Sequence, residues 1–114
     1  VYHLAANPEV QLGITKPEVM QEQNVDVTKR VLEAMKLAEC ENIVFTSTST
    51  VYGDAEQIPT PETAELNPIS AYGTSKLDAE KLIEKYCKDN DLLVIPGSMF
   101  CDSLKNWVRV AWCI

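Results

Sequence analysis

The alternation of short apolar segments with longer helical segments is the feature that most restricts how this chain can fold. Residues 1–5, 42–48 and 92–95 have the length of buried strands; the first and third are apolar runs, and the second has an apolar centre at residues 43–45. Between them, residues 16–38 and 69–88 repeat apolar side chains at helical spacing. The order strand, helix, strand, helix, strand predicts an α/β fold, the βαβαβ portion of a doubly wound parallel sheet.

The first helical segment carries a polar residue on its inward face. A loop over residues 7–14 is expected to precede it, with Thr15 as the N-cap and Pro17 in the first turn. The inward face is predicted to contain Met20, Asn24, Val27, Val31, Met35 and Ala38. A buried amide without a hydrogen-bond partner costs about 1–3 kcal/mol. Asn24 therefore either bonds to a neighbouring loop or faces a ligand cleft, and both interpretations remain open.

Charge and cysteine content disfavour several classes of protein. The chain of 114 residues suffices for one small domain, and its net charge of −7 disfavours nucleic acid as a partner. No apolar run approaches the ~18 residues of a membrane span, so no membrane partner is expected. Four cysteines without a Cys-x-x-Cys pair, together with a single histidine, predict free thiols, no metal site and a cytoplasmic location. That histidine, His3, is interpreted as a core residue with a hydrogen-bonded ring.

Two elements of the sequence can form a proton-transfer site. Residues 46–50 are all serine or threonine and follow an apolar strand centre, at the end where parallel sheets bind ligands. Tyr72 and Lys76 are four residues apart and share one face of a helix. An ammonium beside a phenol favours the phenolate, so Tyr72 can accept a proton from a hydroxyl that Thr48 orients. The tyrosine and lysine alone would indicate only a half-buried pair, and the hydroxyl cluster favours the site.

Residues 1–95 resemble the NAD-dependent epimerase/dehydratase family, the extended short-chain dehydrogenases. The resemblance rests on motifs that occur in the family's order. They are His3-Leu4-Ala5-Ala6, Asn24-Val25, the hydroxyl-rich segment 45–53 ending in Val-Tyr-Gly, and Tyr72 to Lys76. The resemblance implies a partial Rossmann-like doubly wound sheet and NAD as cofactor.

The resemblance also implies roles for individual residues. Tyr72 is the expected proton acceptor, Lys76 binds the cofactor ribose and tunes Tyr72, and Thr48 holds the reacting sugar oxygen. The cofactor is expected to be lined by the backbone of Leu4, Ala5, Ala6, Asn7 and Pro8, by the side chain of Asn24, and by Tyr72 and Lys76. Members of the family are typically homodimers that pair through two long helices.

The residues before Val-Tyr-Gly indicate a subfamily. The 4,6-dehydratases carry acidic residues there, whereas this chain has Ser47-Thr48-Ser49-Thr50. A threonine in that place is similar to the UDP-glucose 4-epimerases of the family, which implies a UDP-sugar substrate oxidised and re-reduced at C4. The alternatives are another NAD-dependent nucleotide-sugar dehydratase or reductase, or a non-catalytic, truncated Rossmann piece.

The two ends of the chain differ from the family pattern. The glycine-rich turn that binds the pyrophosphate would precede Val1, and a C-terminal sugar-nucleotide domain would follow. Residues 1–95 are therefore interpreted as the middle part of an NAD-binding domain that is inactive alone. Residues 96–114 hold both tryptophans and two of the four cysteines. We interpret them as a divergent tail that is frameshifted, and a divergent natural terminus is the alternative. Translating the coding DNA in its other frames tests this hypothesis.

Overall fold

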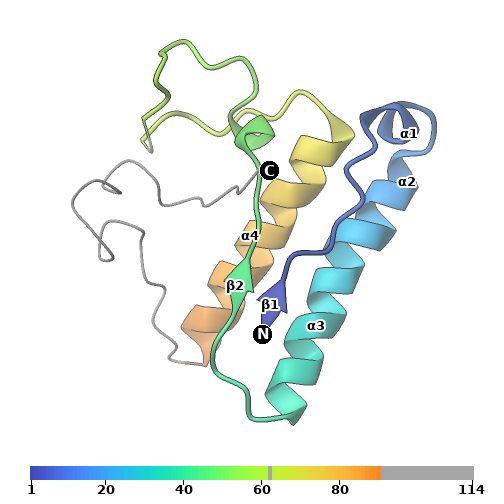
Figure 1. The fold of residues 1–114 in the computed structure, drawn as a ribbon, viewed down its shortest axis with the longest axis vertical. Coiled ribbons are helices and arrows are strands. Elements are labelled where there is room, and N and C mark those ends of the chain that lie inside the picture. Colours follow the sequence, from blue (N-terminus) through green and yellow to red (C-terminus); the bar gives the residue numbers. More distant parts are fainter. Residues whose placement is uncertain (62, 91–114) are drawn as a thin grey trace.

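A two-stranded parallel sheet forms the centre of the computed structural model, which describes residues 1–61 and 63–90 (Figure 1). Strand β1 spans Tyr2–His3 and pairs with β2, Val44–Phe45. The amide of Val44 donates to the carbonyl of Val1 at 2.8 Å, which extends the ladder toward the N-terminus. Both strands are shorter than predicted, because the apolar runs extend beyond the residues that pair. The predicted third strand and the tail lie outside the described residues.

The connection from β1 to β2 contains more helix than predicted. Helix α1, Val10–Thr15, occupies most of the expected loop, and α2, Pro17–Met20, follows it. The hydroxyl of Thr15 donates to two carbonyls inside α1, at 3.3 and 3.4 Å, so the predicted Thr15 cap is wrong and Lys16 precedes the helix. Pro17 starts α2 without the loss of a helical hydrogen bond, since the first N–H groups of a helix have no intrahelical partner.

Helix α2 continues without a break through a π-helical segment, η1, Gln21–Asp26, into α3, Val27–Leu37. The π-helical turn holds more residues than an α-helical turn and rotates the face that follows. Thr28 and Leu32 are therefore buried instead of the predicted Val27 and Val31, which are half-buried. The inward positions Met20, Asn24 and Met35 are confirmed, whereas Ala38 is exposed.

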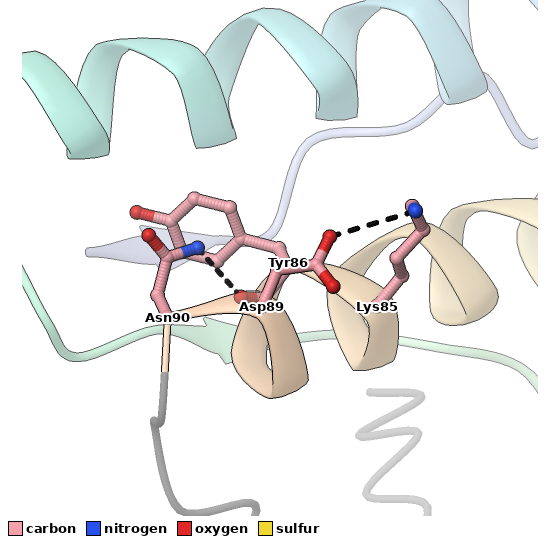
Figure 2. Close-up of polar contacts among 4 residues, drawn as sticks. All are labelled: Lys85, Tyr86, Asp89 and Asn90. Atoms are coloured by element: carbon pink, nitrogen blue, oxygen red, sulfur yellow. Dashed lines mark hydrogen bonds and ion pairs between the residues drawn. The ribbon is translucent and has the colours of Figure 1, made fainter.

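Helix α4, Ala71–Asp89, returns from the sheet and runs antiparallel to the strands (Figure 1). Ser70 caps its first turn, since its hydroxyl accepts from the amide of Gly73 at 3.0 Å. At the other end, shown in Figure 2, the Asn90 side chain donates to the Tyr86 carbonyl at 2.8 Å. An exposed ion pair of 3.5 Å joins Lys85 and Asp89 in the last turn.

The helices cover one face of the sheet. His3 on β1 contacts Thr28 of α3, and Phe45 on β2 lies below the ammonium of Lys76 on α4. The side chains of β1 and β2 that point the other way, Tyr2 and Val44, are exposed. The sheet therefore separates an inward face that carries polar and charged side chains from an open apolar face.

Candidate functional site

The carboxyl ends of β1 and β2 point to the same end of the molecule, where α1, the start of α4 and a 3-10 turn, η2 (Ser49–Tyr52), gather (Figure 1). A cleft of about 510 Å³ lies beside the segment that follows β1. Its lining residues are Ala5, Ala6, Asn7, Pro8, Gln23 and Val27. Four of the residues predicted to line a cofactor thus surround one cleft, whereas Leu4 is exposed and is not among the lining residues.

Asn24 in η1 joins three segments of the chain. Its Oδ1 accepts from the amide of Asn7 at 2.7 Å, and its Nδ2 donates to the Asn7 carbonyl at 3.2 Å. The same Nδ2 donates to the Ser75 hydroxyl on α4 at 2.9 Å, and that hydroxyl donates to the Tyr72 carbonyl at 2.8 Å. The side chain is only 3% exposed. The first of the two open interpretations of Asn24 therefore describes its contacts: the amide holds the loop that borders the cleft.

Replacing Asn24 with alanine is expected to lower the free energy of unfolding by about 2 kcal/mol, because the backbone of Asn7 and the buried Ser75 hydroxyl lose their partners. Urea unfolding measures the loss, and hydrogen exchange should show faster exchange at the Asn7 amide. Gln23→Ala is the matched control, since Gln23 also bonds to Asn7 but at an exposed position, at 2.8 Å. Equal losses in both variants would contradict the proposed difference between a buried and an exposed contact.

Lys76 is buried and its charge is held among polar and aromatic groups. The ammonium donates to the Thr46 carbonyl at the end of β2 at 2.6 Å and lies 4.1 Å from the centre of the Phe45 ring. Burial lowers the pKa of Lys76 to about 8, while the negative charge of Glu80 acts in the opposite direction. A lysine with such a pKa changes its charge near physiological pH, which is typical of functional sites.

Thr48 acts as the N-cap of η2. Its hydroxyl oxygen accepts from the Thr50 amide at 3.3 Å and lies 3.1 Å from the Thr50 hydroxyl. If it accepts from both, its own proton remains available to a further acceptor, because a hydroxyl accepts two hydrogen bonds and donates one. The cap and the predicted contact with a substrate oxygen are therefore compatible.

Tyr72 lies in the first turn of α4, where the helix packs closely on η2. A Cβ atom on the neighbouring Gly73 would lie 2.8 Å from the Thr50 carbonyl, so glycine allows this approach. The Tyr72 side chain is half-buried. The packing of α4 places the turn with Tyr72 beside η2 and the next turn, with Lys76, at the end of β2.

His3 is buried, and its contacts identify Nε2 as the ring nitrogen that donates a hydrogen bond. The Thr28 hydroxyl donates to the Asn24 carbonyl at 2.7 Å, so it accepts from His3 Nε2 at 2.9 Å. The centre of the His3 ring also lies 5.5 Å from the centre of the Phe45 ring. These contacts agree with the interpretation of His3 as a core residue.

Stability is expected to fall as the pH decreases below about 6.5. Burial, followed by the charge of Lys76, lowers the pKa of His3 from its usual 6.5. Below 6.5 the unfolded chain binds a proton that the folded chain does not, so stability present above this pH is lost as the pH falls toward the lowered value. Because His3 is the only histidine, proton NMR reports its titration directly. A midpoint at or above 6.5 would contradict this, and a pH series on His3→Gln separates the contribution of acidic residues.

Two polar residues that lie beside the predicted ones, Ser75 and Glu80, were not singled out from the sequence. Ser75 connects Asn24 to Tyr72, and the Ser47 hydroxyl donates to the Glu80 carboxylate inside the core. Lys76 and Glu80 are four residues apart in sequence. This spacing of one helical turn was the sequence signal that could have placed Glu80 beside Lys76.

The described part of the chain contains no group of three or more side chains able to hold a metal ion. Within the same residues, no helix is long and apolar enough to cross a membrane. The cysteines of this part, Cys40 and Cys87, are free, and burial raises the pKa of the Cys87 thiol. A reactive thiolate is therefore disfavoured at Cys87.

Known proteins match most of the chain. A sequence model of the NAD dependent epimerase/dehydratase family matches residues 1–101. The UDP-glucose 4-epimerase of Streptomyces lividans is 41% identical over 83 residues, which are 73% of this chain and 25% of that protein. The chain thus spans about a quarter of the length of the curated relatives it matches.

Solved structures agree with the sequence matches. The UDP-glucose 4-epimerase of Brucella ovis, in complex with NAD, is 33% identical with a TM-score of 0.78, covering 81% of this chain and 28% of that one. A dTDP-glucose 4,6-dehydratase of Streptomyces venezuelae, with NAD bound, is 30% identical with a TM-score of 0.75, covering 80% and 28%. The predicted α/β, Rossmann-like fold is confirmed as a portion of that fold.

Proposed function

Because the chain belongs to the NAD dependent epimerase/dehydratase family, we propose that it carries the proton-transfer residues of an NAD-dependent nucleotide-sugar epimerase resembling the UDP-glucose 4-epimerases. The observation that carries this proposal is the packing of α4 against β2 and η2. It brings the helical turns of Tyr72 and Lys76 to the segment that contains Thr48. These are the residue types that proton removal from a sugar hydroxyl requires.

The cleft beside residues 5–8 suits a dinucleotide such as NAD. Its volume of about 510 Å³ lies within the range of small-molecule sites. The small side chains of Ala5 and Ala6 allow a ligand to approach the backbone, which Asn24 holds in place through Asn7. NAD, when bound, would accept a hydride from the sugar and return it.

Each of the three site residues then has one task. Tyr72 accepts the proton of the substrate hydroxyl, and Thr48 donates a hydrogen bond to the same oxygen. The Lys76 ammonium offers N–H groups to the ribose. Since the pKa of Lys76 is lowered to about 8, this cation is present at neutral pH and is lost as the pH rises through 8.

Two other functions remain alternatives. A dehydratase on the same scaffold is favoured by the likeness to the 4,6-dehydratase structure, but Ser49 and Thr50 carry hydroxyls where the two acidic residues would be needed. A non-catalytic role is the second alternative, and it predicts that the chain does not bind NAD. If the chain acts as an epimerase, we expect its substrate to be a UDP-sugar and its assembly to be a homodimer.

A chimera tests the proposal. The matching 83-residue segment of the Streptomyces lividans enzyme is replaced by that of this chain, so that the site is completed by an epimerase framework. We expect the chimera to interconvert UDP-glucose and its C4 epimer. A folded, NAD-binding chimera without turnover would overturn the proposal, and formation of a 4-keto-6-deoxy sugar would favour the dehydratase.

Calorimetry with NAD on the chain alone determines whether it holds the cofactor without that framework. Ala6→Phe is expected to block the cleft and abolish any binding, whereas Ala34→Phe, at an exposed position on α3, is expected to leave it unchanged.

A further inference from the structure

A second charged side chain lies buried beside Lys76. Glu80 is only 8% exposed and follows Lys76 by one turn of α4. The hydroxyl of Ser47, itself buried, donates to Glu80 Oε1. This bond holds the Glu80 carboxyl group at the residue that follows the Lys76 contact on Thr46.

Lys76 and Glu80 attach α4 to two consecutive residues of the same strand end. The Lys76 ammonium donates to the Thr46 carbonyl, and the Glu80 carboxylate accepts from the Ser47 hydroxyl. Thr48 is the next residue along the chain. The two attachments therefore fix the position of α4 relative to the segment that carries Thr48. Because Tyr72 is on α4, they also fix the position of its backbone.

We infer that Glu80, oriented by Ser47, is the buried counter-charge that keeps Lys76 in its ammonium form and in register with the end of β2. A buried ammonium without an opposite charge loses its proton more easily, because burial disfavours the charged form. Glu80 is thus a positioning residue. Its consequence for turnover rests on the proposed function, whereas its effect on the charge of Lys76 does not.

The electrostatic surroundings of Lys76 agree with this inference. Burial is the larger influence on its pKa and lowers it to about 8, and Glu80 is the opposing influence. The ammonium also acts on His3 of β1, since the charge of Lys76 contributes to lowering the pKa of His3. The Thr46 carbonyl and the Phe45 ring, on β2, are the uncharged partners.

The test is an NMR titration of the Lys76 side chain in the full chain, with its signal assigned by its absence from Lys76→Met. In the wild type we expect a midpoint near pH 8. Glu80→Gln should lower this midpoint by about one pH unit, because the counter-charge is removed with little change of shape. Glu84→Gln, which removes the same charge from an exposed position on α4, should leave it unchanged. An unchanged midpoint in Glu80→Gln would overturn the inference.

Two further measurements keep the test decisive if Glu80→Gln does not fold. Glu80→Asp retains the charge and should retain the wild-type midpoint more closely than any neutral variant that folds. In the wild type, the carboxyl carbon of Glu80 should show a second inflection at the pH where Lys76 loses its proton, and the lack of one would contradict the pairing. No cofactor or sugar is needed, so failure here leaves the proposed epimerase standing, and an inactive chimera leaves this pairing standing.

Discussion

Replacing Gly53 with alanine is expected to destabilise the folded chain by about 3 kcal/mol or more. Gly53 ends η2 with φ 62° and ψ −133°, a backbone conformation that residues with a Cβ atom rarely adopt. A Cβ atom there would also lie 2.1 Å from the carbonyl oxygen of Asn67. Strain of this kind costs about 1–3 kcal/mol, and the displaced backbone adds to it. Small domains are stable by only about 5–15 kcal/mol, so the loss is a large fraction.

Urea unfolding at neutral pH measures the effect of Gly53→Ala. The neighbouring substitution Asp54→Ala, at an exposed position, serves as the control and is expected to change the midpoint little. The loop after Gly53 leads to the start of α4, so NMR shifts of residues 68–73 should move in Gly53→Ala. A loss below about 1 kcal/mol would mean that the loop near Asn67 moves away freely.

Removing the hydroxyl of Tyr72 is expected to reduce turnover by the chimera about 10²–10⁴-fold, the usual contribution of general acid–base catalysis. Tyr72→Phe keeps the ring, so α4 should retain its packing against η2. Binding of the nucleotide sugar should change little, because the lost group acts on the proton. The expected result is therefore a lowered kcat with a nearly unchanged KM.

Tyr86→Phe is the matched control for this experiment. Tyr86 is also half-buried on α4 but lies near the helix end farthest from η2 (Figure 2). Its substitution should leave kcat unchanged. Equal losses in both variants would show that the phenol at position 72 has no special role, and the proposed function would lose its proton acceptor.

The pattern of the sequence was sufficient for the family, for the first two strands and for the two long helical segments. Short apolar runs and helical repeats indicate which segments are buried, and this information is local. The helix over residues 17–37 and the parallel pairing of β1 with β2 are confirmed. The roles of Thr48, Tyr72 and Lys76 stay predictions, which the chimera tests.

The helix boundaries and the inward faces of the helices were predicted less well from the sequence. The prediction of a loop over residues 7–14 was wrong, because Val10–Thr15 forms α1. A constant helical period also misplaced Val27 and Val31, since the π-helical turn rotates everything after Asp26. That turn contains Asn24, whose amide bonds to residues 17 positions before it and 51 after it in sequence.

The sequence selected Tyr72 and Lys76 as candidates from their spacing on one helix face together with the hydroxyl cluster over residues 46–50. The surroundings of Lys76 came from the fold. Its carbonyl partner is 30 residues away, and the serine that holds Glu80 is 33 residues away from it. The charge state of a buried lysine depends on such neighbours, since burial and nearby charges set its pKa together. No local pattern contains them, and they meet only once α4 has packed against the end of β2.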